Sequence, residues 1–342
     1  MRRDRAVVAM TTPVAIALFF AGAAVSLASS WIVVSRIERV GSRLGASEAL
    51  LGLISALAAD APEITSAVSA LLAHRRAVGA GVVIGSNVFN LAALLGLGSI
   101  VAGAIALHRR VVLFQGAIAL WVALACVLTV AGLVTPALGL LLVLVVLAPY
   151  AALAALDGSR WWLRPDPSAL RRWLTRAIAE EELELSATIH PRRGRPRDVA
   201  VAFLALVVVV VASAAMEQSA ARLGVRLSVP GIVVGGIVLA AVTSLPNAVA
   251  AVYWANRGRG VAMLSTGLNS NALNVAAGFL VPSVLIGIGR GSVQEALIAL
   301  WYAGLTAVVL LFAYGHRGLR RPVGWLIVAA YAAFIIVLTA MS

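Results

Sequence analysis

Long apolar runs recur along the whole chain, and they constrain its fold more than any other feature. We count ten of them, at about 11–34, 49–72, 79–104, 111–131, 137–156, 199–216, 230–253, 261–288, 293–313 and 323–341. Each is long enough for a helix that crosses a bilayer, which needs about 20 apolar residues. Hydrophobic residues make up 62% of the chain and the mean hydropathy is +1.00. The runs are continuous rather than alternating, so the sequence predicts an all-α polytopic membrane protein and not a β-barrel.

A polar stretch at 157–198 divides the runs into two sets of five. We interpret 1–156 as a first membrane repeat, 157–198 as a cytoplasmic linker and 199–342 as a second membrane repeat. The linker can form an amphipathic surface helix, and a solvated linker is the alternative. The apolar face of that helix would hold Leu170, Trp173, Leu174, Ala177 and Ile178. The N-terminus resembles a signal peptide, but its apolar run is long, and we interpret it as the first membrane helix.

The formal net charge of +13 comes from 27 basic residues against 14 acidic ones. Most of the basic residues lie in short connections or in the linker, as the positive-inside rule describes for cytoplasmic segments. Their distribution predicts that both termini lie outside the cell membrane and that the linker is cytoplasmic. No basic stripe with interleaved aromatic residues occurs, so we exclude nucleic acid as a partner. The single Cys126 excludes an internal disulfide and a thiolate metal cluster.

Two short motifs occur once in each half at a constant separation. DAPEITSAVSA aligns with SLPNAVAAVYW, so that Pro62 matches Pro246 and Glu63 matches Asn247. GSNVFN aligns with NSNALN at the same separation of 184 residues. The shared spacing indicates an internal duplication. A repeat with an odd number of spans enters the membrane from the opposite side, so we predict two inverted five-helix repeats, as in many secondary transporters.

The two prolines lie inside predicted spans, where each removes a hydrogen bond and frees a carbonyl that must face protein or water. We therefore predict two broken helices that meet near the membrane midplane. Asp60 and Glu63 are the only acids that we place deep in a span, where a carboxylate costs at least ~2.5–3.5 kcal/mol. Carboxylate and carbonyl oxygens are the ligands that Ca²⁺ prefers. The side chains that supply such oxygens or hydroxyls near the breaks are Asp60, Glu63, Ser86, Asn90, Asn247, Ser270 and Asn274.

The paired segments resemble the two α-repeats of the cation/calcium exchanger superfamily, and the sodium/calcium exchangers in particular. That family's pattern reads roughly G-T-S-x-P-E followed by G-S-N-x-F-N, once in each half. GSNVFN at 85–90 matches it, and TSLPN at 243–247 matches except at its last residue. ERVGSRLGASEALLG at 38–52 also resembles the family's approach to the first repeat. The resemblance covers both halves without the linker, and it implies that each half is a sodium/calcium exchanger membrane repeat.

The resemblance implies that cations bind between the two repeats and cross by alternating access, with the first and sixth spans sliding across a fixed bundle. The transported cations would be Ca²⁺ together with Na⁺ or H⁺, with no cofactor, and the lipid bilayer would be the other partner. The ligands carried over from the family are Glu63, Ser86, Asn90, Thr243, Ser244, Ser270 and Asn274. Asp60 and Asn247 stand at motif positions and complete the predicted cation site.

The chain departs from the family's pattern at its carboxylates. Asn247 replaces the second glutamate, and Asn274 stands where some members keep an aspartate. Asp60 replaces the motif serine, and Ala58 and Ala59 replace glycine and threonine. The two remaining carboxylates balance one divalent cation but leave less charge for several sodium ions. Because neighbouring carboxylates in a low dielectric favour binding of a proton, a proton-coupled calcium or other cation antiporter is the alternative.

The altered motifs also leave open a second class of function, a non-transporting membrane sensor or partner-binding relative that kept the fold. An intramembrane aspartyl protease would need two facing aspartates on different helices, whereas only Asp60 lies deep in a span. No histidine lies at a span centre to act as the base of a serine protease. We therefore predict a transporter and not an enzyme.

Overall fold

The computed structural model describes residues 11–44, 48–155, 173–174, 176–177 and 195–341. The described chain is helical apart from short connections and two short strands. The predicted surface helix of the linker falls largely outside the described residues, which include Trp173, Leu174 and Ala177 but not Leu170 or Ile178.

The spanning segments of the two halves follow one order, with a broken helix second and a long inner segment third. The first half contains α1 (Thr12–Leu44), α2 (Glu48–Ala59), α3 (Ala61–Leu72), α4 (Arg76–Asn90), the π-helix η1 (Leu91–Leu97), α5 (Gly98–Ala102), β1 (Ala104–Ala106), α6 (Arg109–Val130) and α7 (Pro136–Ala155). The second contains α10 (Pro196–Arg226), α11 (Gly231–Val233), the π-helix η2 (Val234–Leu239), α12 (Ala240–Thr243), α13 (Leu245–Ala255), α14 (Gly260–Leu273), the π-helix η3 (Asn274–Leu280), α15 (Val281–Ile286), α16 (Val293–Gly315), β2 (Gly318–Arg320) and α17 (Arg321–Ala340).

Eight helices in the described part of the chain are long and apolar enough to cross a membrane. A bent pair, Gly231–Thr243 with Leu245–Ala255, raises the number to nine. The predicted count of ten is therefore not confirmed, because α2 and α3 have only 12 residues each. Helices α1 and α10 extend well beyond the predicted runs 11–34 and 199–216. The apolar runs mark only the apolar part of each helix. The backbone hydrogen bonds of α1 and α10 continue into the polar residues beyond it.

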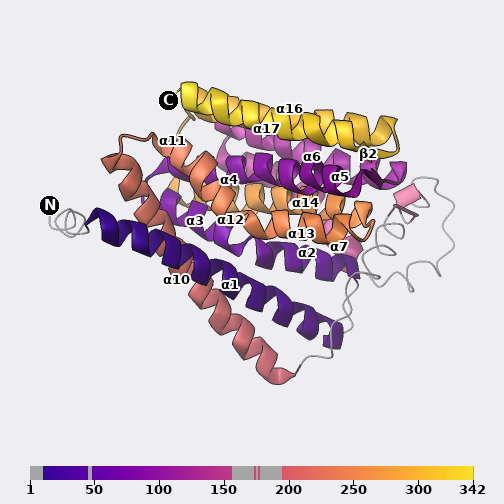
Figure 1. Cartoon of the computed structure of the whole chain (residues 1–342), viewed down its shortest axis with the longest axis horizontal. Helices are drawn as coiled ribbons and strands as arrows, with labels where there is room; N and C mark the ends of the chain where they lie inside the picture. The colour runs from indigo at the N-terminus through magenta and orange to yellow at the C-terminus, as the bar shows by residue number, and fades with distance from the viewer. Residues whose placement is uncertain (1–10, 45–47, 156–172, 175, 178–194, 342) are drawn as a thin grey trace.

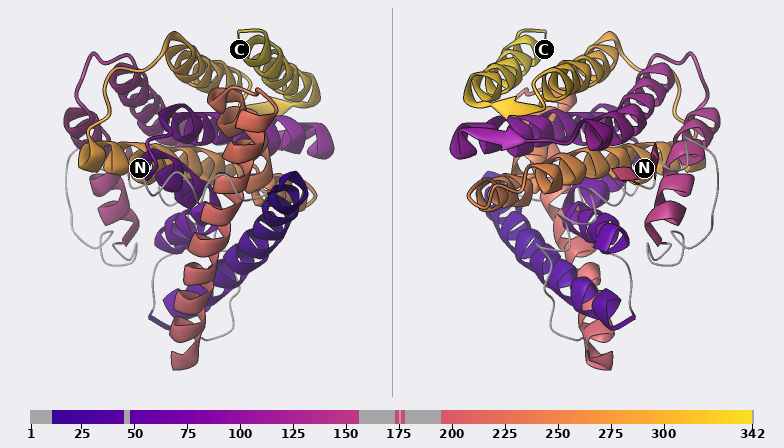
Figure 2. Two further views of the ribbon diagram at one scale, coloured as in Figure 1. Left: turned by 90° about the vertical axis from the view of Figure 1, so that its left-hand side faces the viewer. Right: turned by 90° about the vertical axis from the view of Figure 1, so that its right-hand side faces the viewer.

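Helices α1 and α10 pack along each other as a crossed pair at one face of the molecule (Figures 1 and 2). A hydrogen bond of 2.5 Å joins the hydroxyls of Ser26 and Ser213. An ion pair of 2.7 Å joins Arg36 to Asp198. The other spanning segments lie together on one side of this pair (Figure 2). The pair is thus connected internally by polar contacts at two levels.

Glu217 corrects the prediction that only two acids lie deep in a span, because it is fully buried within α10. Arg75 donates to its carboxylate from Nε at 3.0 Å and from Nη2 at 2.6 Å. Ser69 donates a further hydrogen bond of 3.1 Å. A buried carboxylate is tolerated when it is paired and hydrogen-bonded in this way. Glu217 therefore ties α10 to the turn between α3 and α4.

Helix α4 is the most enclosed of the long segments, since 94% of the most apolar stretch of Arg76–Ala102 is buried. Its glycines allow the backbone of η2 to approach closely. A Cβ atom built on Gly85 would lie 2.2 Å from the carbonyl oxygen of Gly236, and one on Gly81 would lie 2.8 Å from the nitrogen of Gly236. Both distances are far below van der Waals contact, so this helix packing depends on the absence of side chains.

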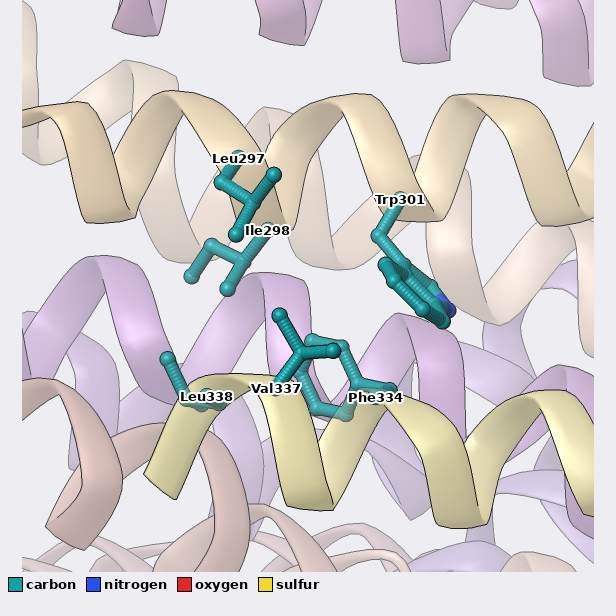
Figure 3. A pocket seen from close by; sticks show the side chains of 6 residues that line it. All are labelled: Leu297, Ile298, Trp301, Phe334, Val337 and Leu338. Carbon is teal, nitrogen blue, oxygen red and sulfur yellow. The ribbon is translucent and has the colours of Figure 1, made fainter. Parts of the chain in front are cut away.

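Two peripheral contacts complete the fold. Strands β1 and β2 pair antiparallel with Ile105 opposite Leu319, a small addition that leaves the predicted all-α class unchanged. Helices α16 and α17 pack through apolar side chains (Figure 3). The residues drawn there are Leu297, Ile298, Trp301, Phe334, Val337 and Leu338. The space between them has no volume for even a water-sized group, so it is helix packing and not a binding pocket.

Candidate cation site

Both predicted helix breaks are present. Asp60 separates α2 from α3, and Ser244 separates α12 from α13. Pro62 and Pro246 lie in the first turn of the helix that follows each break. The second break bends the chain by 44°. Proline lacks the N–H that would continue the hydrogen-bond ladder, and this places both breaks just before it.

The break after α2 leaves backbone carbonyls without a helical donor. Pro62 has no N–H for the carbonyl of Ala58, four residues before it. The Ser30 hydroxyl on α1 donates to that carbonyl at 3.0 Å and lies 3.2 Å from the carbonyl of Ala59. Helix α1 therefore provides a hydrogen-bond donor to carbonyls that the break has freed, which lipid could not provide.

Asp60 and Glu63 lie side by side at this break, each only 1% exposed, and are close enough to repel each other. Both carboxylates bind side chains of the opposite repeat. Ser270 donates to Oδ1 of Asp60 at 2.7 Å. Ser244 donates to Oε1 of Glu63, and Asn274 donates to Oε2. The acids of the first repeat thus meet hydroxyl and amide groups of the second.

Asn247 stands in the second repeat where Glu63 stands in the first, and it binds Asn90, the last residue of the GSNVFN motif in the first repeat. Asn247 donates from Nδ2 to Oδ1 of Asn90 at 2.9 Å. Asn90 donates in turn to the Ser270 hydroxyl at 3.2 Å. Asn247 also lies near the Asp60 carboxylate. One connected network therefore links the two helix breaks to α4, which carries Asn90, and to α14, which carries Ser270.

Asn87 and Asn271 hold equivalent positions in the two repeats, and they form a reciprocal pair. Each side-chain amide donates to the backbone carbonyl of the other residue, at 3.1 and 3.0 Å. Oδ1 of Asn271 accepts from Asn90 at 3.2 Å, and Oδ1 of Asn87 accepts from Asn274 at 3.3 Å. Exchange of the two halves reproduces each contact, so an approximate twofold axis passes between α4 and α14. The sequence signal for this pair was the repeated Ser-Asn of both motifs, which also fits interhelical hydrogen bonding.

Two of the three π-helices, η1 and η3, follow the same relation. η1 begins directly after Asn90, and η3 begins at Asn274. π-helical turns are rare in proteins overall, and those that occur are often found at functional sites. No periodicity in the sequence distinguishes them from ordinary helix, so the sequence could not predict them.

Thr243 is the predicted residue whose contacts fit the site least well. It is buried, but its hydroxyl donates to the carbonyls of Leu239 and Ala240 in its own helix, at 2.9 and 3.3 Å. Such bonds are the usual partners of a hydroxyl in a helix. Ser86 lies on α4 one turn before Asn90, at the position equivalent to Ser270. The structure therefore gathers the predicted carboxylates, amides and Ser270 and Ser244 into one network, while Thr243 serves its own helix.

Three buried oxygens at the site have no hydrogen-bond partner among the described residues: Oδ2 of Asp60, Oγ of Ser86 and Oδ1 of Asn274. An unpaired buried polar atom costs about 1–3 kcal/mol, which a bound cation would offset. The described residues contain no cluster of three or more His, Cys, Asp or Glu side chains placed to hold a metal ion. The donor set is two carboxylates with neutral oxygens, which suits a hard cation.

Comparison with known proteins places both halves in one family. A profile of the sodium/calcium exchanger protein family matches residues 14–156 and 198–340. Over 82 residues the chain is 38% identical to a protein of Alkalimonas amylolytica named "Putative antiporter CaxA". That match covers 24% of this chain and 26% of the relative, so the chain matches about a quarter of that relative's length.

The solved structures of the sodium-calcium exchanger NCX_Mj share the fold of this chain over most of its length. The crystal soaked with zero Na⁺ and Ca²⁺ aligns with a TM-score of 0.59 and 19% identity, over 96% of this chain and 100% of that chain. The crystal soaked with 100 mM Na⁺ and 10 mM Sr²⁺ gives 0.61 and 18%, over 95% and 99%. The predicted architecture of two membrane repeats with broken helices is thereby confirmed.

Proposed function

This chain belongs to the sodium/calcium exchanger family, a family of multi-pass membrane transporters and not of enzymes, and we propose that it is a secondary active antiporter exchanging Na⁺ for Ca²⁺. The pair of buried carboxylates at the first helix break carries the proposal. Asp60 and Glu63 are 1% exposed and are held by the opposite repeat. Carboxylates kept in a membrane interior mark ion pathways.

We assign cation binding to the network around the two breaks. Asp60 and Glu63 supply the charge, and the neutral ligands are Ser86, Asn90, Ser244, Asn247, Ser270 and Asn274. Thr243 would join them when its hydroxyl leaves the carbonyls of its own helix. A site shared by both repeats suits alternating access, because motion of one part against the other opens it to one side at a time.

The crossed pair of α1 and α10 is the part that we propose to move. Its helices are joined to each other by Ser26–Ser213 and Arg36–Asp198. They are also little enclosed, with 39% and 28% of their most apolar stretches buried against 94% for α4 and its continuation, a property that they share with α7 and α17 at 28% and 22%. The pair would slide across the remaining helices and alternately cover the two faces of the site.

Calcium uptake into proteoliposomes tests the function. We expect ⁴⁵Ca²⁺ to accumulate when Na⁺ is loaded inside and diluted outside, and not when the Na⁺ gradient is collapsed by an ionophore. A pH gradient without sodium is the parallel experiment. Protein-free liposomes and a calcium ionophore at the end give the zero and the full release. Folded protein that moves no calcium under either gradient would contradict the assignment.

A proton-coupled calcium antiporter is the second candidate, and one observation favours it. Both carboxylates lie at the same break, whereas Ser244 and Asn247 occupy the equivalent positions of the other break and carry no charge. Adjacent carboxylates in a low dielectric favour sharing a proton. Uptake driven by the pH gradient alone would select this candidate.

We also propose that the repeats 1–156 and 199–342 lie in the cell membrane with both termini outside and the linker 157–198 in the cytoplasm. In intact cells, a membrane-impermeant maleimide should label Ser228→Cys, between the sixth and seventh spans, and not Arg176→Cys in the linker. The native Cys126 is buried and provides an unlabelled background. Labelling in the opposite pattern would reverse the orientation.

A further inference from the structure

We propose that the ion pair between Glu217 and Arg75 is a latch that stabilises one of the two conformations of the transport cycle, and that the other conformation has no equivalent ion pair. The latch consists of Glu217 on α10 and its two donors, Arg75 and Ser69. The inference rests on the proposed sliding of α1 and α10, and it states which end of that movement is favoured.

Glu217 connects the part that moves to the part that stays in place. Its carboxylate is fully buried and accepts hydrogen bonds from Nε and Nη2 of Arg75, at 3.0 and 2.6 Å. The hydroxyl of Ser69 on α3 donates a third hydrogen bond, at 3.1 Å. Charge-assisted hydrogen bonds of this kind are strong and directional. They therefore hold α10 at one height along α3.

The turn that carries Arg75 is itself attached to the helices that stay in place. The next residue, Arg76, donates from Nε to Glu295 on α16 at 2.8 Å and from Nη1 to the carbonyl of Gly289. Two adjacent arginines thus bind α10 and α16 from one turn. A slide of a single helical turn is about 5.4 Å, which is well beyond hydrogen-bond length. Sliding of α10 therefore has to break the contacts of Glu217, whereas those of Glu295 can persist.

In this structure the crossed pair contacts mainly the broken helix of the first repeat. Helix α10 packs against α3, and α1 packs against α2. Among the described residues, α1 has no extended contact with α13, the repeat equivalent of α3. Val33 on α1 is buried in one cluster with Ala58 and Ala61 at the first break. Inverted repeats exchange their roles between the two conformations, so we expect the pair to contact α13 in the other conformation.

The second repeat has an arginine at the position that would form such a latch. Arg259 follows Arg75 by the repeat separation of 184 residues. Each of the two directly precedes a motif helix, α14 or α4, and their backbones are nearly identical. Arg259 has φ −88° and ψ 64°, and Arg75 has φ −94° and ψ 63°. The turn between α13 and α14 therefore presents an arginine in the same way.

Helix α1 has no acid at the position that would meet this arginine. The repeat separation relates Glu217 to Val33, and an alignment shifted by one residue relates it to Val34. A valine side chain offers no acceptor to a guanidinium group. The nearest acid along α1 is Glu38, about one helical turn beyond Val34. The latch is therefore present in one conformation and has no counterpart in the other.

The size of the effect follows from the contacts that sliding breaks. Hydrogen bonds to charged groups contribute enough to change an equilibrium about 10- to 100-fold. The Arg75 side chain is 34% exposed, so water can replace part of its contacts, and we take the lower end of this range. Loss of the Glu217 charge should change the ratio of the two conformations by about 10-fold.

Spin labels on the two sides of the latch test the proposal without measuring transport. Val225→Cys on α10 and Leu285→Cys on α15 replace side chains that are 81% and 77% exposed, and the native Cys126 is buried. Pulsed electron spin resonance in calcium-free nanodiscs gives the populations of the distances between the labels. We expect Glu217→Gln to shift the ratio of two distance populations about 10-fold away from the one that wild-type protein favours. An unchanged ratio in folded Glu217→Gln would overturn the latch.

Two further variants separate the latch from a general loss of packing. Glu295→Gln removes the neighbouring ion pair, which joins two parts that stay in place, and it should leave the ratio unchanged. Arg75→Lys keeps the charge but loses the contact through two nitrogens, so it should shift the ratio in the same direction by a smaller factor. Thermal unfolding shows which variants are folded. A shift in Glu295→Gln as large as in Glu217→Gln would contradict the proposal. If Glu217→Gln does not fold, an unchanged ratio in Arg75→Lys would contradict it.

Calcium exchange measured from each side of the membrane gives the functional counterpart. In Glu217→Gln the half-saturating calcium concentrations on the two sides should move in opposite directions, because the shift makes the site more available on one side and less on the other. A change in the same direction on both sides would contradict the latch. Folded wild-type protein that moves no calcium under sodium or proton gradients would overturn the proposed function, and the label distances would still decide whether Glu217 holds α10.

Discussion

Replacing Glu63 by glutamine should reduce calcium exchange by a factor on the order of 1,000 while the protein stays folded. The glutamine has nearly the same shape and keeps an oxygen that can accept the hydrogen bond that the Ser244 hydroxyl now donates to Glu63. It removes one of the two charges that face the cation. Two unit charges 4 Å apart at an effective dielectric of 20 interact by about 4 kcal/mol, which corresponds to roughly a 1,000-fold change in affinity. Initial rates of ⁴⁵Ca²⁺ uptake measure this loss.

The matched control for Glu63→Gln is the same substitution at an acid that lies away from the site. Glu38 lies on α1 more than two turns beyond Ser30, the residue that touches the first break. Glu38→Gln should transport calcium as the wild type does, and both variants should elute as a single species with a thermal midpoint near that of the wild type. Normal uptake by folded Glu63→Gln would show that this carboxylate is not a cation ligand.

Replacing Gly85 by alanine should lower the free energy of unfolding by about 3 kcal/mol or more. The new Cβ atom would lie 2.2 Å from the carbonyl oxygen of Gly236 and 2.6 Å from its Cα atom. Both are backbone atoms, so α4 and η2 would have to separate instead of a side chain turning away. Overpacking of a buried contact costs about 1–3 kcal/mol and occasionally more, and a clash between two backbones belongs at the upper end. Thermal unfolding in detergent measures the effect.

Gly304 provides the control for helix propensity, because it lies on α16 and a methyl group on its Cα atom would meet no described atom within 4 Å. Alanine is the better helix former by about 0.5–1 kcal/mol, so Gly304→Ala should be neutral or slightly stabilising. Equal thermal midpoints for the two variants would mean that the close approach of α4 to η2 does not limit stability.

The helix breaks could be predicted from the sequence because their cause is local. Proline interrupts a helix wherever it lies, and Pro62 and Pro246 do so next to Asp60 and Ser244. The meeting of the two breaks could also be predicted, since the motifs recur at one spacing in two inverted repeats. The carboxylates and amides that this spacing selected do bind one another across the repeats.

Other features depend on partners that lie far away in the chain. Glu217 is buried because α10 runs past its apolar stretch and meets Arg75, which lies in the other repeat. The hydroxyl of Ser30 satisfies a carbonyl freed by Pro62, although nothing in the sequence pairs the two. The predicted role of Thr243 stays open for a similar reason, since only the three-dimensional contacts show its hydroxyl on its own helix.

The departures from the family pattern leave the amide contacts symmetric between the two halves but make the distribution of carboxylates asymmetric. Asn87 with Asn271, and Asn90 with Asn274, keep equivalent contacts in both halves. The acids do not follow the relation, because both lie in the first half. The structure therefore keeps a symmetric set of amide contacts around two carboxylates that both belong to the first half.

The location of the bound cation tests the central claim most directly. A crystal of the protein grown with Ca²⁺ should give one anomalous peak between the two breaks, with Oδ2 of Asp60 and Oδ1 of Asn274 at about 2.3–2.6 Å, the usual range for calcium–oxygen ligands. The peak should disappear in Glu63→Gln at the same calcium concentration. A peak on other residues, or one that persists unchanged in Glu63→Gln, would contradict the assignment of Asp60 and Glu63 as the charged ligands of the transported cation.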